Sequence, residues 1–274
     1  MMKAIPYILI LPLALIVLFT QCEKDPEPGN IPDDNFFNAL IELGVDTNGD
    51  GEISTAEAEV ITYLDVRHDS ISDMTGIEAF INLDTLNCRG NQLTSLDVSN
   101  NTGLTELVCD WNQLTSLDVS NNTGLHALWC ERNQLTSLDV SNNTALKTLF
   151  CRNNQLTSLD VSNNTALIYL VCNNNQLTSL DVSNNTALID LRCGGNQLTT
   201  LDVSNNTALT ILHCSNNQLT SLDVSNNMQL RNLLFGEMPS LIKVCVWILP
   251  FPPDELTIDK EGSDNVYFTT DCSK

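Results

Sequence analysis

The sequence predicts a mainly β fold, a solenoid of stacked coils that are each 21 residues long. Seven cysteines recur at a strict spacing of 21 residues, and each stands in the same local pattern of leucines. Self-similarity at a fixed period is typical of repeat proteins, in which each unit contacts its neighbours. A coil this short has room for strands and turns and none for a full helix. The cysteines are Cys88, Cys109, Cys130, Cys151, Cys172, Cys193 and Cys214.

Each coil is predicted to make two extended passes. Residues 104–114 read L-x-x-L-x-C-x-x-N-x-L, and residues 114–125 read L-x-x-L-x-V-x-x-N-x-x-L. Because side chains alternate along a strand, Leu107 and Cys109 should point inward and Val108 outward. The first passes should form parallel strands in one sheet, and the second passes either continue as extended chain or form a second sheet. This pattern is the leucine-rich-repeat signature.

The array is predicted to cover residues 61–238 in nine coils, with Val66 and Phe235 at the position of the cysteines in the outermost coils. The cysteines share one inward position, where a thiol behaves as a small apolar group, so we expect buried free thiols rather than a metal site or stacked disulfides. An inward column of asparagines should satisfy the backbone of neighbouring coils. Its members are Asn91, Asn112, Asn133, Asn154, Asn175, Asn196 and Asn217.

A solenoid exposes apolar ends, so capping segments are expected on both sides of the array. Residues 33–60 are predicted to form the front cap, with a helix over residues 33–45. The following loop matches the EF-hand pattern, in which alternate oxygen ligands surround a calcium ion. A metal-free capping turn is the alternative. The calcium ligands are predicted to be Asp46, Asn48, Asp50, Glu52, Ser54 and Glu57.

The two ends of the chain carry signals of export. Residues 1–21 combine a basic start with a short apolar run, as in a signal peptide, and Cys22 follows as a candidate lipidation site. Residues 22–32 should form a solvated tether; secretion without a lipid is the alternative. At the far end, residues 239–274 are predicted to form a cap in which Cys245 and Cys272 bracket a proline-containing segment. A disulfide between them suits an exported protein.

These features resemble those of bacterial surface proteins with leucine-rich repeats. A truncated EF-hand-like cap that leads into the repeats is similar to the front end of internalins. The acidic stretch after Cys22 and the C-terminal cysteine pair resemble BspA-like lipoproteins of the Bacteroidota type. The resemblance implies a lipid-anchored protein at the outer membrane or cell surface. It also implies adhesion, in which the concave sheet recognises a protein of a host or neighbouring cell.

The outward positions of the first pass differ from coil to coil, whereas the second pass is almost invariant. Aromatic residues and arginine dominate interface energies, so we interpret the variable positions as the ligand-facing surface. Two alternatives remain: the side chains simply cover the sheet, or the aromatic residues stack on a glycan. The predicted ligand-facing residues are Val108, Trp111, Trp129, Arg132, Phe150, Tyr169, Val171, Arg192 and His213.

The charge of the chain argues against several partners and activities. A formal net charge of −22 opposes binding to nucleic acid or anionic lipid, so membrane contact is expected only through a lipid anchor. The three histidines, His68, His126 and His213, belong to different coils, and no nucleophile or phosphate-loop motif occurs, so we do not predict an enzyme. A column of aspartates on the second pass, Asp97 to Asp223, should be a solvated stripe with counter-ions or raised pKa values.

Overall fold

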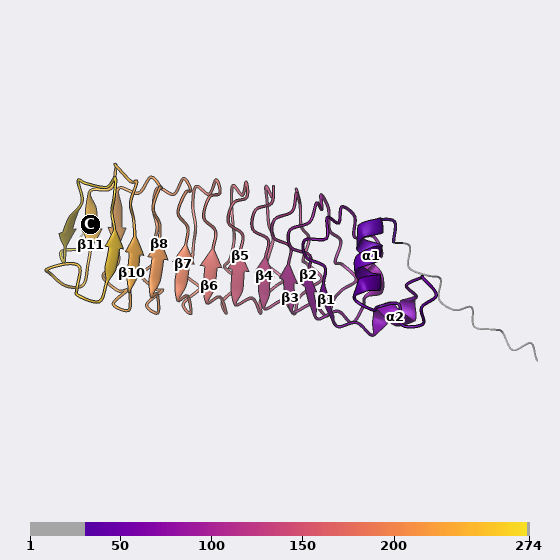
Figure 1. Ribbon diagram of the computed structural model, residues 1–274. Helices are drawn as coiled ribbons and strands as arrows, with labels where there is room; N and C mark the ends of the chain where they lie inside the picture. Colours follow the sequence, from indigo (N-terminus) through magenta and orange to yellow (C-terminus); the bar gives the residue numbers. More distant parts are fainter. Residues whose placement is uncertain (1–30, 273–274) are drawn as a thin grey trace, which may run out of the picture.

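The computed structural model describes residues 31–272 as a curved rod of stacked coils with a small helical cap at one end (Figure 1). The predicted signal peptide and Cys22 lie outside the described residues. The cap contains helices α1 (Asp34–Glu42) and α2 (Thr55–Glu59), and a short 3-10 helix (Ile77–Ala79) follows in the first coil. No helix among residues 31–272 is both long enough and apolar enough to span a membrane.

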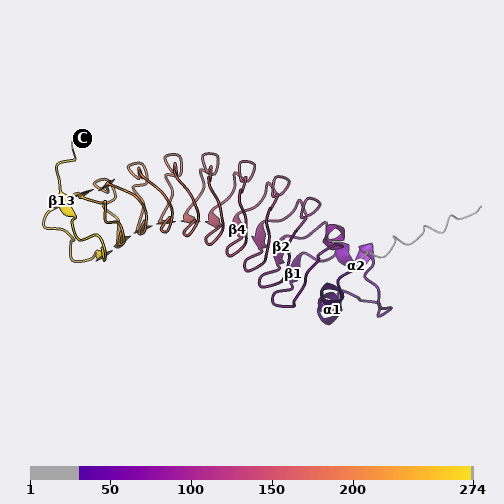
Figure 2. The same ribbon diagram turned by 90° about the horizontal axis from the view of Figure 1, so that it is seen from above.

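One parallel sheet runs the length of the rod, as predicted. It has ten strands in the order β1-β2-β3-β4-β5-β6-β7-β8-β10-β12, and Figure 2 shows that the sheet lines the concave side. Nine of its strands are the first passes of the predicted coils, and the tenth, β12, comes from the C-terminal cap. The strands are β1 (Tyr63–Asp65), β2 (Thr85–Asn87), β3 (Glu106–Val108), β4 (Ala127–Trp129), β5 (Thr148–Phe150), β6 (Tyr169–Val171), β7 (Asp190–Arg192), β8 (Ile211–His213), β10 (Asn232–Leu234) and β12 (Thr257–Asp259).

The second passes do not form a sheet along the whole rod. Within residues 31–272, the strands that pair there are β9 (Ser221–Asp223), β11 (Lys243–Cys245) and β13 (Tyr267–Thr269), in the order β13-β11-β9, and a single bridge joins Asp202 to Asp223 of β9. Figure 2 shows the reason: the second passes lie on the convex side, where the curvature spreads neighbouring coils apart. The second sheet is therefore confined to the C-terminal end.

Leucine, valine and cysteine side chains fill the inside of every coil. Leu107, Cys109 and Val119, for example, are all fully buried, which confirms the predicted alternation. The seven ladder cysteines are free thiols, also as predicted. Burial raises the pKa of each thiol, that of Cys88 to about 12. These thiols therefore stay protonated at neutral pH and fill the core as small apolar groups.

Two columns of asparagine hold neighbouring coils together. In the predicted column, Asn112 accepts a hydrogen bond from Leu93 N–H and donates from Nδ2 to the carbonyl oxygens of Cys88 and Cys109. The second column runs from Asn101 to Asn227 in steps of one coil and was not predicted from the sequence. There Asn122 donates to the carbonyl oxygens of Val98 and Asn101. The second column thus links the convex side, where strand pairing is missing over most of the array.

Specific contacts fasten a cap to each end. At the front, Asp33 caps α1 by accepting from the N–H groups of Asn35 and Phe36 through Oδ1. Its Oδ2 accepts from the backbone and hydroxyl of Ser72, which ties the helix to the first coil. At the far end, Cys245 and Cys272 form the predicted disulfide. The C-terminal segment also continues both sheets, so it is an extension of the array as well as a cover.

Candidate binding surface

The concave face is built from the outer two residues of each three-residue strand. The central leucine points into the core, and the residues before and after it point outward. Parallel pairing places equivalent residues side by side, so Trp129 lies next to Phe150, and Val171 lies between Phe150 and Arg192. The register thus turns scattered variable positions into one continuous surface.

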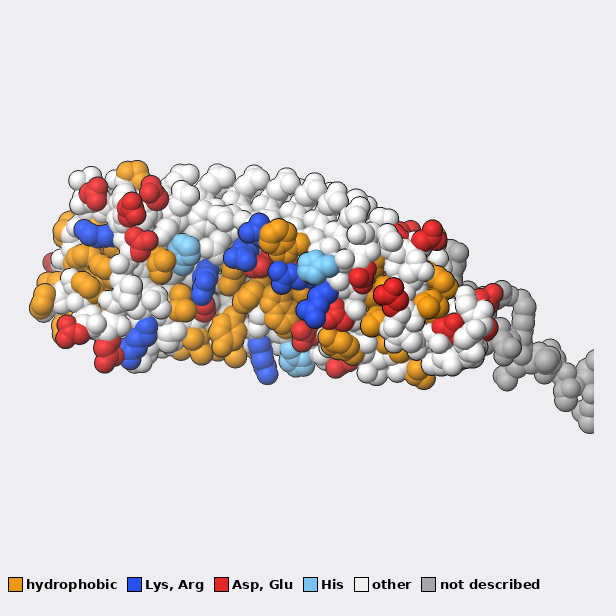
Figure 3. Space-filling model, viewed as in Figure 1, with side chains coloured by type: hydrophobic (Ala, Val, Ile, Leu, Met, Phe, Trp, Pro, Cys, Tyr) orange, Lys and Arg blue, Asp and Glu red, His pale blue; other side chains and the backbone are white. Residues whose placement is uncertain are grey.

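Aromatic side chains occupy the middle of this face. The rings of Trp129 and Phe150 meet edge to face, with centroids 6.2 Å apart, and both side chains are half-buried. Tyr169 and Trp111 are 42% and 47% exposed. Val171 is only 7% exposed, so it offers little surface to a ligand; in the sheet it lies between Phe150 and Arg192. Figure 3 shows hydrophobic side chains gathered at the middle of the face.

Trp111 and Arg132, in the turns after β3 and β4, have an unusual backbone conformation. Two residues after the cysteine, the backbone is left-handed, with φ of 55° at Trp111 and 51° at Arg132. Most other coils place asparagine or glycine here, the residues that tolerate this conformation. The guanidinium of Arg132 lies 4.1 Å from the centroid of the Trp111 ring, a cation–π contact. Two bulky residues in a strained backbone conformation indicate selection for a property other than stability.

Charged residues on the face form two layers. Glu131 and Asp190 are buried, and the half-exposed side chains of Arg152 and Arg192 pair with them at 2.8 Å and 2.9 Å. Asp110 is also buried and accepts a hydrogen bond from the N–H of Glu131. Burial raises the pKa of Asp110 to about 6, although the hydrogen bond from Glu131 N–H lowers it. The acidic groups thus form the lower layer, and the guanidinium groups are outermost.

His213 lies on the same face, half-buried beside Asn173, whose Nδ2 is 3.2 Å from the Nδ1 atom of the ring. Burial and the neighbouring Arg192 lower its pKa, so the ring is neutral at physiological pH. It can therefore contribute hydrogen bonds to a ligand but little charge.

The opposite, convex face is acidic and regular. Each aspartate of the column accepts hydrogen bonds from the serine two residues later, as Asp118 does from Ser120 N–H. These bonds lower the pKa of Asp97, Asp118, Asp139, Asp160 and Asp181, so the expectation of raised values was wrong. Donation from serine outweighs the repulsion between exposed carboxylates, which water screens.

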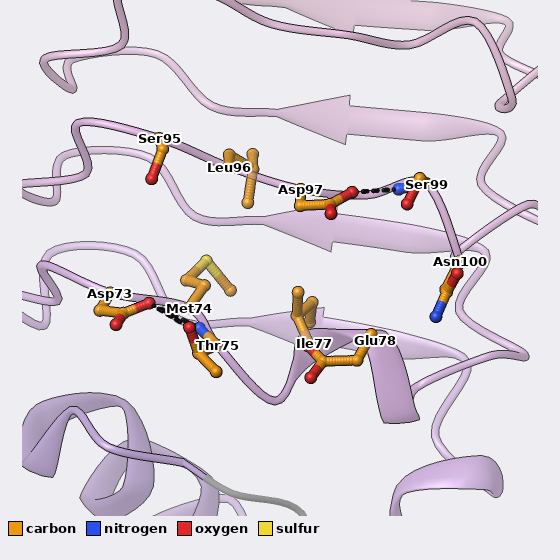
Figure 4. Close-up of a pocket in the computed structure, with 10 residues that line it drawn as sticks. All are labelled: Asp73, Met74, Thr75, Ile77, Glu78, Ser95, Leu96, Asp97, Ser99 and Asn100. Carbon is orange, nitrogen blue, oxygen red and sulfur yellow. Dashed lines mark hydrogen bonds between the residues drawn. The ribbon is translucent and has the colours of Figure 1, made fainter.

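A shallow hollow of about 370 Å³ lies on this side, between the second passes of the first two coils (Figure 4). Two of its acidic groups are engaged locally: Asp73 accepts from Thr75, and Asp97 accepts from Ser99. Its lining is polar and open, without an exposed aromatic group. The hollow therefore offers less for recognition than the concave face.

The loop of the front cap has the oxygen groups that calcium prefers. Asp46 accepts from Gly49 N–H and Gly51 N–H, and Gly51 has a φ of 81°, the turn that an EF-hand loop requires. Asn48, Asp50 and Glu52 are exposed, whereas Glu57 is buried.

Both oxygens of Glu57 accept hydrogen bonds, Oε1 from Thr47 and Oε2 from Ser54. Bonds from Ser54, and then from Thr47, lower the pKa of Glu57 to about 2, so this carboxylate is ionised. The donor set fits a hard cation, although Glu57 would have to exchange some of these bonds to coordinate one.

Comparison with known proteins agrees with the fold. No protein-family model matches the chain. Internalin J of Listeria monocytogenes is 45% identical over 71 residues, which are 26% of this chain and 8% of internalin J. The solved functional domain of InlJ from the same organism, which includes a cysteine ladder, is 35% identical with a TM-score of 0.67. The alignment covers 86% of this chain and 61% of that domain.

The chain has a leucine-rich-repeat fold and is similar to internalins. Internalin C2 of Listeria monocytogenes is 26% identical, with a TM-score of 0.64, over 76% of this chain and 96% of internalin C2. A leucine-rich-repeat protein of Leptospira interrogans is 25% identical over 69% of this chain and 51% of its own, with a TM-score of 0.60. The matches span 8% of internalin J and 61% of the solved InlJ domain.

The sequence predicted most residues of this surface but not its charged layer. The structure places the predicted ligand-facing residues on adjacent coils of one face. Arg152, Glu131 and Asp110 were not predicted, because the prediction was based mainly on aromatic residues at the strand positions. A signal was available: all three directly follow a ladder cysteine, a position that varies between coils.

Proposed function

We propose that this internalin-like protein binds a protein partner on its concave face and performs no catalysis. The observation that carries the proposal is the contrast between a nearly invariant scaffold and one variable face with partly exposed aromatic and arginine side chains. Such residues dominate protein–protein recognition. The structural likeness to internalins supports the same type of role. A protein at a host or neighbouring cell surface would be reached from a lipid anchor on Cys22.

A displayed random-peptide library tests this function. The library is selected on the mature protein and counter-selected on the double variant Trp129→Ala, Phe150→Ala, whose fold is checked by its melting curve. We expect peptides that bind the wild type and not the variant. Selection of no peptide, or only of peptides that bind both proteins equally, would contradict protein recognition by this face.

A glycan-binding role is the second candidate, because the aromatic side chains of Trp111 and Tyr169 are exposed and aromatic rings can stack on sugars. A glycan array probed with the wild type and with Trp111→Ala separates the two functions. Binding of a defined glycan that disappears in the variant would favour the carbohydrate role.

We also propose that one calcium ion binds the front-cap loop in a structural role. The support is the set of oxygen groups on Asp46, Asn48 and Asp50 together with the left-handed Gly51. We expect calcium to raise the melting temperature of the wild type, and Asp50→Ala to abolish the rise. The matched control Asp254→Ala, an exposed carboxylate in the other cap, should keep it. An equal melting temperature with calcium and with chelator would exclude the site.

Lipid attachment at Cys22 is proposed from the sequence signal alone. Mass spectrometry of the protein expressed in a bacterium with a lipoprotein pathway tests it. A mature N-terminus at an acylated Cys22, lost in Cys22→Ser, is expected; an unmodified Cys22 would favour simple secretion.

A further inference from the structure

We propose that the partner on the concave face is an acidic protein surface, with carboxylates arranged around an apolar side chain. This inference rests on the proposed function and names the chemistry of the partner. The surface concerned, here called the basic–aromatic patch, comprises Trp111, Trp129, Arg132, Lys147, Phe150, Arg152, Tyr169 and Arg192.

The first argument is the segregation of charge within the array. Between residues 84 and 234, every lysine and arginine lies in a first-pass strand or within three residues of one, and none lies on the second pass. The second pass carries the aspartate column instead. In Figure 3 the lysine and arginine side chains of the array surround the apolar centre of the face, and acidic side chains are more frequent towards the ends. A chain with net charge −22 thus concentrates its positive groups on one side.

The second argument is the layering of charges on that side. The side chain of Glu131 is 9% exposed and that of its partner Arg152 is 44% exposed. Asp190 and Arg192 repeat the arrangement, at 12% and 44%. The ion pair of Arg152 engages Nε, so its Nη donors stay available for a second carboxylate. An approaching protein therefore meets guanidinium groups first, although acidic groups lie beneath them.

The third argument distinguishes a protein from other polyanions. The cations are few, and they surround an apolar centre formed by Trp129, Phe150 and Tyr169. A uniformly charged polymer would leave this centre without an apolar contact and would be repelled by the rest of the chain. An acidic protein surface with an aromatic or aliphatic side chain at its middle matches both components.

The peptide selection described above gives the first test. The peptides selected should carry Asp or Glu close to Leu, Phe or Trp. If no peptide is selected, the proposed function fails and this inference fails with it. If selected peptides are neutral or basic, protein recognition stands and the acidic partner is rejected.

Three synthetic peptides give the quantitative test. They share the centre Leu-Phe-Leu and carry Glu, Gln or Lys on both sides, and binding is followed by tryptophan fluorescence in a Trp247→Phe background. At low salt we expect the Glu peptide to bind about tenfold more tightly than the Gln peptide. At about 0.5 M salt the difference should largely vanish because charges at the surface are screened.

Charge variants locate the effect on the face. Arg132→Gln with Lys147→Gln should remove most of the advantage of the Glu peptide, and Lys260→Gln in the C-terminal cap should leave it unchanged. Equal affinity for the Glu and Gln peptides, or tighter binding of the Lys peptide, would overturn the inference. So would a sulfated polysaccharide that binds the patch as tightly as the Glu peptide. Self-association of the wild type that disappears in the Arg132/Lys147 variant would also overturn the inference, because the partner would then be a second copy of this chain.

Discussion

At the scale of single residues, several residues of the concave face lower the stability of the folded protein. Trp111 and Arg132 take a left-handed backbone that other coils reserve mainly for asparagine or glycine. Asp110 is buried on the face with a raised pKa, beside a second acidic residue, Glu131. An array under selection for stability alone would carry neither feature. Both features therefore predict that a substitution on this face stabilises the fold.

Replacing Trp111 by Asn should stabilise the fold and weaken ligand binding. The left-handed conformation disfavours a bulky residue by about 1–2 kcal/mol. The contact with Arg132 that would be lost contributes roughly 0.5–1 kcal/mol at an exposed site. A net gain of about 0.5–1 kcal/mol in the free energy of unfolding is expected, measurable by urea denaturation. Asn153→Trp is the reciprocal control and should destabilise; a Trp111→Asn protein less stable than the wild type would contradict the argument.

Replacing Asp110 by Asn should stabilise the protein at neutral pH and have little effect in acid. Because the pKa of Asp110 is about 6 in the folded state and its ordinary value is 3.8, the folded state holds the proton more tightly. This group therefore favours folding at low pH, and its contribution is lost as the pH rises from about 4 through 6. Asparagine keeps the acceptor for Glu131 N–H without the charge, so a gain of about 1–3 kcal/mol is expected at about pH 8.

The measurement is urea denaturation of both proteins at about pH 8 and about pH 4. The difference between wild type and variant isolates Asp110 from the other carboxylates. A gain that is the same at both pH values would mean that titration of Asp110 is not its cause.

At the scale of structural elements, each coil is held by different bonds on its two sides. The concave side has parallel strand pairing, and the convex side has mainly asparagine side chains over most of the array. The asparagine columns are thus as structural as the leucines. The sequence predicted the first column from its inward position. The second column was not predicted, although its asparagines follow the buried valine by three residues, just as those of the first column follow the cysteine.

Removal of a buried asparagine should be far more damaging than removal of an exposed one. Asn154→Ala would leave the N–H of Leu135 without its partner and would remove one of the two asparagine donors from each of the carbonyl oxygens of Cys130 and Cys151. We expect a loss of about 2–4 kcal/mol from one unpaired buried N–H and two further lost hydrogen bonds. Asn142→Ala removes one exposed bond to Ser120 and should change stability by about 0.5 kcal/mol or less. Thermal unfolding compares the two, and equal losses would refute a special role for the column.

At the scale of the whole molecule, the repeat period alone was sufficient to predict the solenoid, its inward residues and the sheet. It could not predict the curvature, because curvature depends on how closely the two passes of adjacent coils approach each other. The confinement of the second sheet to the C-terminal end follows from that packing. The charged layer of the face was also out of reach, since Arg152 and Glu131 belong to different coils and meet only in the folded register.

The C-terminal disulfide should stabilise its own end of the rod much more than the middle. Coils contact mainly their neighbours, so a local loss need not spread along the array. Cys245→Ser with Cys272→Ser should lower local stability by about 3 kcal/mol. Hydrogen exchange followed by mass spectrometry should show faster exchange in β11, β12 and β13, with β3 to β6 unchanged. Uniformly faster exchange over all coils would instead indicate one cooperative unit.

The stacking direction of the coils also has a mechanical consequence. If the chain is held at its N-terminal end and pulled through a ligand bound to the middle coils, the force runs along the rod. It then loads the strand hydrogen bonds and asparagine bonds between coils in series, so they break one coil at a time. Each detached coil of 21 residues releases roughly 70 Å of chain. The protein would yield in small steps under load and refold by adding coils onto those that remain.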